Sequence, residues 1–329
     1  MAVLVCGGAG YIGSHGVAYL LERGEDVVVL DNLQTGHKDA VLKKAKLYVG
    51  DLRDGEVLDK VFQENSVDSV IHFAADSLVG VSVEEPLQYY DNNVYGALCL
   101  LKKMKEYDVK QIVFSSTAAT YGEPESMPIQ ETDITNPTNP YGETKLAVEK
   151  MLKWSANAYG INYVILRYFN VAGAHPTIDI GEDHKPETHL VPIVLQVALG
   201  QRESIKIFGD DYPTEDGTCI RDYIHVSDLI QAHLLALDYL KAGGDSDVFN
   251  LGNGNGFSVK QVIDTVEKVT NIEIKREIAP RRAGDPAVLI ASSSKAQEVL
   301  KWKPKFASLE EIIETAWKWH QAHPEGYAE

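Results

Sequence analysis

The sequence predicts an α/β protein with a Rossmann-type, doubly wound parallel sheet and a smaller C-terminal α/β domain. Short runs rich in β-branched residues alternate with longer helix-like stretches along the first half of the chain, which is typical of βαβ units. These runs cover residues 2–6, 27–30, 47–49, 69–73, 111–115 and 162–168. Right-handed crossovers between parallel strands would place helices on both faces of the sheet.

The charge of the chain limits its possible partners. The 329 residues include 31 Lys+Arg and 48 Asp+Glu, which gives a formal net charge of −17. This surplus disfavours nucleic acids and anionic membrane surfaces, since both are bound through basic side chains. The apolar runs are short and the chain enters a strand directly, so we expect no membrane span and no signal peptide. Three cysteines outside any Cys-x-x-Cys pair favour a reducing, cytoplasmic location.

A glycine-rich turn follows the first predicted strand. Gly7, Gly10 and Gly13 precede a predicted helix, and Asp31 ends the second strand. This order is typical of a dinucleotide site, in which the backbone approaches a pyrophosphate at the helix N-terminus. Asp31 would bind the adenosine ribose hydroxyls and repel a 2′-phosphate, which favours NAD over NADP. Asp51, at the end of the third strand, either contacts the adenine or only caps the next helix.

Tyr141 and Lys145 form a Tyr-x-x-x-Lys pair near the start of another predicted helix. Positions four apart share one helix face, so the phenol and the ammonium should point in the same direction. A nearby ammonium favours the phenolate and makes the tyrosine a better base. Thr117, at the end of a preceding strand, supplies a hydroxyl where ligands bind in such sheets. We therefore predict that Tyr141, Lys145 and Thr117 are catalytic.

Several motifs together resemble one known family. The glycine motif and the Tyr141/Lys145 pair occur with SST at residues 115–117, RYFN at 167–170 and RDYIHV at 221–226. This combination resembles the extended short-chain dehydrogenase/reductase family. Segments that narrow the resemblance to the UDP-hexose 4-epimerases of that family are residues 31–32, 89–94, 209–218, 279–285 and 323–327.

The resemblance implies an activity. Such enzymes hold NAD tightly, oxidise a UDP-sugar transiently at C4′ to a 4-keto intermediate, and reduce it again from its other face, which interconverts UDP-glucose and UDP-galactose. Tyr141 would be the base and later the acid, and Lys145 would tune it and hold the nicotinamide ribose. Thr117 would bind the 4′-oxygen, at a position where serine is common in the family. Galactose and nucleotide-sugar metabolism is the implied setting.

The motifs and the resemblance together define two sets of binding residues. The predicted NAD-binding positions are Gly7, Gly10, Tyr11, Ile12, Gly13, Asp31, Asn32, Thr35, Gly36, Asp51, Leu52, Phe73, Ala74, Ala75, Asn92, Tyr141, Lys145 and Tyr168. The predicted UDP-sugar-binding positions are Thr117, Tyr141, Asn170, Leu190, Phe208, Arg221, Arg282, Asp285 and Leu289. Residues 1–170 would then form the NAD-binding domain. Residues 171–329 would mainly bind the UDP-sugar, with some segments returning to the main sheet.

Two positions bear on the substrate. Leu289 stands where relatives carry either a tyrosine or a smaller residue, and its size would leave room for an N-acetyl group. We therefore expect UDP-N-acetylglucosamine and UDP-N-acetylgalactosamine to be interconverted as well. His189 stands where some relatives have asparagine, so its role is left open.

The sequence also bears on alternative functions, on assembly and on metal binding. Related 4,6-dehydratases and decarboxylases place carboxylates directly after the strand-end hydroxyl, where this chain has Ala118 and Ala119. Another nucleotide-sugar epimerase, or a non-enzymatic NAD-sensing protein, is a further alternative. The resemblance also implies a homodimer that packs through the helix after Pro86 and the helix carrying Tyr141. No metal site is expected, because His175, His184 and His189 lack the spacing of metal ligands.

Overall fold

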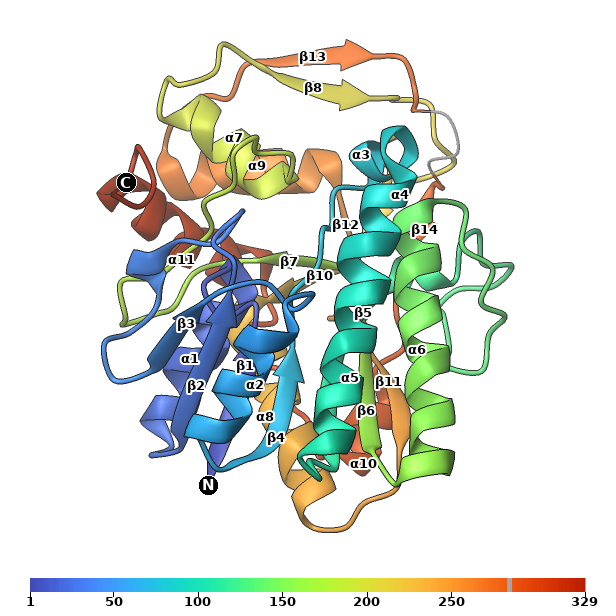
Figure 1. The fold of residues 1–329 in the computed structure, drawn as a ribbon. Helices are drawn as coiled ribbons and strands as arrows, with labels where there is room; N and C mark the ends of the chain where they lie inside the picture. The colour runs from blue at the N-terminus through green and yellow to red at the C-terminus, as the bar shows by residue number, and fades with distance from the viewer. Residues whose placement is uncertain (283–285, 329) are drawn as a thin grey trace.

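The computed structural model describes residues 1–282 and 286–328, and its centre is a sheet of seven parallel strands (Figure 1). The strand order is β11-β6-β5-β4-β1-β2-β3. The strands are β1 (Ala2–Cys6), β2 (Asp26–Asp31), β3 (Lys46–Val49), β4 (Val67–His72), β5 (Gln111–Thr117), β6 (Asn162–Tyr168) and β11 (Asp247–Leu251). The predicted Rossmann-type fold is therefore confirmed. Strand β11 comes from late in the chain and pairs with β6 at one edge.

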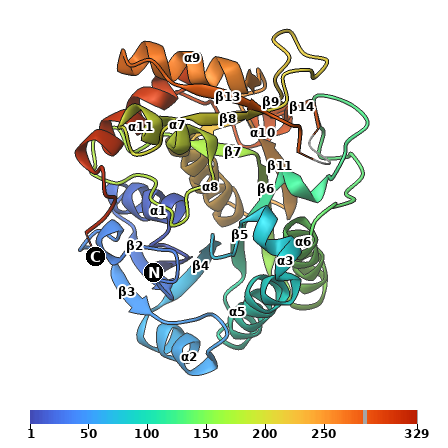
Figure 2. The ribbon, with the colours of Figure 1, turned by 90° about the horizontal axis from the view of Figure 1, so that it is seen from above.

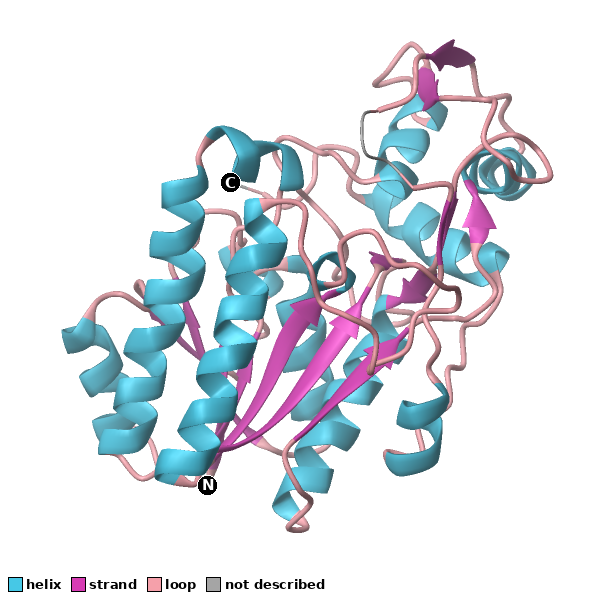
Figure 3. Cartoon of the chain, turned by 90° about the vertical axis from the view of Figure 1, so that its right-hand side faces the viewer, coloured by secondary structure: helices cyan, strands magenta, loops and turns pink. Residues whose placement is uncertain are grey.

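Helices cover both faces of this sheet, as Figure 3 shows from the side. One layer contains α1 (Tyr11–Glu22), α8 (Val226–Lys241) and α10 (Ser294–Val299), and the other contains α2 (Gly55–Glu64), α5 (Gly96–Glu106) and α6 (Pro140–Tyr159). Strand β1 shows why two layers are needed, because all five of its residues are buried. Successive side chains of a strand point to opposite faces, so Val3 and Val5 pack under one layer and Leu4 under the other.

A smaller group of elements lies beyond the carboxyl ends of the main strands (Figures 1 and 2). Its helices are α7 (Leu190–Ala198), α9 (Val259–Thr270) and α11 (Leu309–Ala322), which share one apolar core. Its strands form the pairs β7 (Asn170–Ala172) with β10 (Tyr223–His225) and β8 (Ile205–Phe208) with β13 (Arg276–Ala279), and a third small sheet of β9 (Ile220–Arg221), β12 (Phe257–Ser258) and β14 (Val288–Leu289). None of the helices in the described ranges is both long and apolar enough to cross a membrane.

Short helices connect β4 to α5 on the side of α6. They are α3 (Val79–Glu84), α4 (Pro86–Tyr89) and η2 (Tyr90–Tyr95), which run one after another into α5. Side chains cap the N-termini of several of the longer helices. Asp54 accepts hydrogen bonds from the first turn of α2, and Ser258 forms a reciprocal capping box with Gln261 at the start of α9.

A buried ion pair joins α6 to two central strands. The Glu149 carboxylate on α6 accepts hydrogen bonds from Arg167 Nε (2.9 Å) and Nη2 (2.5 Å) on β6, and from Ser116 Oγ (2.6 Å) on β5. The side chains of Glu149 and Arg167 are 0% and 4% exposed. Removing one partner of such a pair leaves a buried charge without compensation, which typically costs about 3–5 kcal/mol.

We expect Glu149→Leu to lower the free energy of unfolding by about 3–5 kcal/mol, because the Arg167 guanidinium would stay buried without its carboxylate. The double variant Glu149→Leu/Arg167→Met should recover most of this loss, since it buries no unpaired charge. Urea denaturation of both proteins measures the effect. The exposed Glu143→Gln on the same helix is the control and should change stability by less than about 0.5 kcal/mol. Equal stability of the single and double variants would contradict the assignment.

Candidate active site

The glycine turn after β1 leaves room for an anionic group at the start of α1. A Cβ atom at Gly13 would lie 2.0 Å from the Gly7 carbonyl oxygen, so only glycine lets the helix pack this closely on the turn. At Gly10 a Cβ atom would meet nothing nearer than 3.5 Å, so this backbone borders open space. Gly10 is also the N-cap of α1 and provides no side-chain cap. The first-turn amides are thus suited to hold a pyrophosphate.

Asp31 is positioned for the ribose of a bound dinucleotide. Its carboxylate accepts hydrogen bonds from the backbone N–H of Ala9 and of Leu33, both at 2.9 Å. Each carboxylate oxygen keeps a further lone pair for a ligand hydroxyl. Burial raises the pKa of Asp31, and the two backbone donors oppose that rise. The turn and this carboxylate therefore fit NAD as the bound group.

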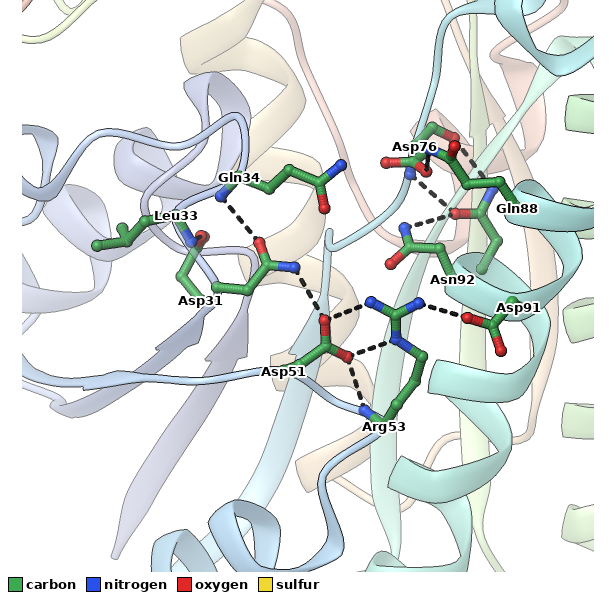
Figure 4. Close-up of polar contacts among 11 residues, drawn as sticks. Asp31, Leu33, Gln34, Asp51, Arg53, Asp76, Gln88, Asp91 and Asn92 are labelled. Atoms are coloured by element: carbon green, nitrogen blue, oxygen red, sulfur yellow. Dashed lines mark hydrogen bonds and ion pairs between the residues drawn. The ribbon is translucent and has the colours of Figure 1, made fainter. Parts of the chain in front are cut away.

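Asp51 belongs to a polar network of side chains beside Asp31, which consists of Asn32, Asp51, Arg53 and Asp91 (Figure 4). It accepts Asn32 Nδ2 at 3.0 Å and pairs with Arg53 through two side-chain contacts of 2.6 and 2.8 Å. Arg53 also contacts Asp91 of η2 at 2.5 Å. The Arg53 guanidinium holds the pKa of Asp51 well below its usual range. The alternative that Asp51 caps the following helix is wrong, because Asp54 caps α2.

The three predicted catalytic side chains meet at the carboxyl end of β5. Tyr141 is in the first turn of α6, whose N-cap Asn139 accepts the Gly142 N–H at 2.9 Å. Its phenol lies near Thr117, the last residue of β5, and this hydroxyl acts to lower the pKa of the phenol. Lys145 Nζ lies 6.0 Å from the centre of the Tyr141 ring and donates to the Ser115 carbonyl oxygen at 2.9 Å. Helix and strand thus bring the phenol, the amine and the hydroxyl together.

Burial shifts both titratable groups of this set toward their neutral forms. It raises the pKa of Tyr141 to about 12, against the opposing hydrogen bond with Thr117. It lowers the pKa of Lys145 to about 7, against the opposing charge of Glu149. The expected lowering of the phenol's pKa by Lys145 is therefore not seen in the protein alone. Desolvation of the phenolate is the largest cause of the shift.

Tyr168, which is predicted to lie beside the nicotinamide, is next to the three predicted catalytic residues. Tyr168 is opposite Thr117 in the β5/β6 register. Burial raises its pKa well above the usual range. Phe73 follows β4, and its ring centre is 4.8 Å from that of His233 on α8. His233 Nε2 in turn contacts Ser115 Oγ at 2.8 Å, so these aromatic side chains surround the end of β5.

The other predicted cofactor positions lie along the same edge of the sheet. They are Tyr11 and Ile12 in the first turn of α1, Thr35 and Gly36 in the loop after Asn32, Leu52 after β3, Ala74 and Ala75 after β4, and Asn92 in η2. The Tyr11 hydroxyl donates to the Gly173 carbonyl oxygen at 2.6 Å. The phenol of Tyr11 is therefore engaged with Gly173, and it is the backbone of Tyr11 that borders the glycine turn.

The predicted UDP-sugar residues come from the smaller group of elements. Asn170 opens β7 and donates to the Asp222 carbonyl oxygen at 3.2 Å, and Leu190 opens α7. Phe208 ends β8, with the Arg282 guanidinium 4.0 Å from its ring centre. Arg221 and Leu289 are opposite each other in the β9/β14 register. Asp285 lies outside the described residues.

Two groups of polar residues are not predicted by the sequence patterns. The first is the Glu149–Arg167 pair; Glu149 is four residues beyond Lys145 on the same helix, but its partner Arg167 is on another element. The second is a cluster of Glu182, His184, Glu187 and His189, whose side chains converge in the loop before α7. The spacing of the histidines alone indicates no site.

Comparisons with known proteins agree with this geometry. A model of the NAD dependent epimerase/dehydratase family matches residues 3–252, and the chain belongs to this family. Within it, the UDP-glucose 4-epimerase of Halalkalibacterium halodurans is 65% identical over 328 residues, covering 100% of this chain and 98% of that protein.

Solved structures of similar fold include UDP-glucose 4-epimerases. A crystal structure of a UDP-glucose 4-epimerase has a TM-score of 0.99 and 63% identity, with 100% of both chains covered. The UDP-glucose 4-epimerase from Bifidobacterium longum, in complex with NAD⁺ and UDP, has a TM-score of 0.93 and 41% identity, and the match covers 99% of this chain and 100% of that one.

Proposed function

We propose that this protein is an NAD-dependent UDP-glucose 4-epimerase, an isomerase that interconverts UDP-glucose and UDP-galactose. The observation that carries the proposal is the convergence of Tyr141, Lys145 and Thr117 at the carboxyl end of a Rossmann sheet, in a chain of the epimerase/dehydratase family. Similarity to named UDP-glucose 4-epimerases along the whole chain supports the choice of substrate.

Each catalytic side chain has a distinct task in this proposal. Tyr141 takes the proton of the sugar 4′-hydroxyl and later returns a proton to the same oxygen. Thr117, whose hydroxyl lies near that phenol, holds the 4′-oxygen beside it. Lys145 is fixed by the Ser115 carbonyl and keeps an amine near the phenol. Bound NAD⁺ supplies the hydride acceptor for C4′, the donor for its return, and a positive charge that favours the phenolate.

The residues after Thr117 argue against a dehydratase. Ala118 and Ala119 form a short 3₁₀ turn there and offer no carboxylate for an elimination. A 4-keto sugar in this site therefore has no acidic partner at those positions to remove a group from a neighbouring carbon. Its simplest fate is reduction back to a hexose, which is epimerisation.

The two parts of the chain divide the binding tasks. Residues 1–170 hold NAD through the glycine turn, Asp31 and the polar network shown in Figure 4. Residues 171–329 mainly hold the UDP-sugar, with Arg221 and Arg282 as the cations for its diphosphate. A cytoplasmic location is consistent with the three free cysteines.

Replacing Tyr141 by phenylalanine tests the proposed base. Tyr141→Phe should keep bound NAD, because the ring remains, but should lower turnover of UDP-galactose by about 10²–10⁴-fold, since the acid/base group is lost. Turnover is measured by a coupled UDP-glucose assay, and NAD content by release after denaturation. The control is Tyr159→Phe at the far end of the same helix, which should keep wild-type turnover. Turnover of Tyr141→Phe within tenfold of wild type would refute the assignment.

The size of Leu289 predicts the range of sugars. The purified protein, without added NAD, should interconvert UDP-glucose with UDP-galactose and UDP-N-acetylglucosamine with UDP-N-acetylgalactosamine. Leu289→Tyr should reduce turnover of the N-acetyl pair at least tenfold more than that of the plain pair, because the larger ring occupies the space for the acetyl group. Chromatography of the four UDP-sugars measures both reactions. Wild-type protein without N-acetyl activity would contradict the role of Leu289.

A homodimer is also part of the proposal. The helices α3, α4, η2 and α6 each have an exposed apolar or aromatic side chain, namely Val83, Leu87, Tyr95 and Trp154. Leu87→Asp should therefore shift the sedimentation coefficient from a dimer toward a monomer. Ile134→Asp is a matched control, because Ile134 is 80% exposed against 81% for Leu87 but lies outside these helices. A monomeric wild-type protein would contradict the dimer.

A further inference from the structure

The loop between β7 and α7 gathers two carboxylates and two imidazoles. Glu182, His184, Glu187 and His189 each present one nitrogen or oxygen atom, and these four atoms lie within 4.8 Å of one another. The sequence pattern Glu-x-His-x-x-Glu-x-His belongs to no regular element, so only the path of this loop brings the side chains together. The residues are separate from the proposed catalytic set.

The four contacts between imidazoles and carboxylates in this cluster have lengths close to those between ligand atoms of a four-coordinate metal site. His189 Nδ1 lies 2.9 Å from Glu187 Oε1 and 3.1 Å from Glu182 Oε1, and His184 Nδ1 lies 3.3 Å from Glu182 Oε1 and 3.6 Å from Glu187 Oε2. Ligand atoms at about 2.0–2.2 Å from one tetrahedral zinc ion are separated by about 3.3–3.6 Å. Small side-chain adjustments would therefore centre an ion among these four atoms.

The burial of the two carboxylates favours a cation. The side chains of Glu182 and Glu187 are both 4% exposed, and two buried negative charges side by side are costly unless positive charge balances them. A divalent cation balances the same two charges and leaves the imidazoles neutral, as ligation requires.

We propose that Glu182, His184, Glu187 and His189 bind one structural Zn²⁺. Two imidazole nitrogens and two carboxylate oxygens in a tetrahedral arrangement suit zinc, which accepts both ligand types without a preferred geometry of its own. Glu187 is also oriented from outside, because its Oε1 accepts the backbone N–H groups of Thr188 and His189, both at 2.7 Å. Such surrounding hydrogen bonds hold ligands in place.

The position of the ion gives it a role in the fold. His189 is the N-cap residue of α7, and Leu190, a predicted UDP-sugar contact, opens that helix. The His184 ring centre lies 6.3 Å from that of Tyr11 in the first turn of α1. A zinc ion here would hold the loop in place between α1, at the predicted cofactor site, and α7, at the predicted substrate site.

Metal analysis of the full-length protein tests this proposal independently of epimerase activity. The protein, purified through a tag that binds no metal and without chelators, should contain about one zinc ion per chain by mass spectrometry of the elements. Replacing the zinc with Co²⁺ should give the intense visible absorption of a four-coordinate site. Removing the metal with a chelator should lower the melting temperature, and added Zn²⁺ should restore it.

Single variants identify the ligands. His184→Gln and His189→Gln should each lower the zinc content at least tenfold and abolish the Co²⁺ absorption. His323→Gln is the control, because His323 also contacts a carboxylate, that of Asp179 at 3.1 Å, but lies outside the cluster, so it should keep a full equivalent of zinc. Wild-type protein with less than a tenth of an equivalent of zinc and no four-coordinate Co²⁺ spectrum would overturn the proposal, as would full zinc content in both variants.

Discussion

The buried pair of Glu149 and Arg167 is the interaction on which the catalytic geometry depends. Its bidentate contact fixes α6 against β6, and the additional hydrogen bond from Ser116 fixes the same carboxylate to β5. Tyr141 and Lys145 precede Glu149 on this helix, so their distance from Thr117 follows from the position of the pair. A charge that is expensive to bury is retained where it sets the register of a helix on a sheet.

Burial also shifts the pKa values of the predicted catalytic residues Tyr141 and Lys145. In the interior, Tyr141 holds its proton more tightly and Lys145 holds its proton less tightly than either would in water. A phenol in this state is a weak base until positive charge arrives beside it. In the proposed mechanism, acid/base chemistry by Tyr141 would therefore depend on the bound oxidised cofactor.

The loop between β7 and α7 connects the two parts of the protein. It accepts the Tyr11 hydroxyl at the Gly173 carbonyl oxygen, carries the glutamate and histidine cluster, and ends at the N-terminus of α7. A long loop without regular structure needs such fixed points to hold its path. The predicted cofactor-binding and substrate-binding residues on either side of it therefore depend on where this loop runs.

Local features of the sequence were enough for the fold class and for the centre of the candidate site. The alternation of strands and helices, the glycine spacing before Asp31 and the four-residue spacing of Tyr141 and Lys145 are all short-range patterns, and short-range geometry is encoded directly in neighbouring residues. Three things required the tertiary structure. They are the pairing of Glu149 with Arg167 from another element, the rise in the pKa of Tyr141 caused by its burial, and the meeting of Glu182 and Glu187 with two histidines. Each depends on which groups lose water together, and that is decided only when distant segments pack.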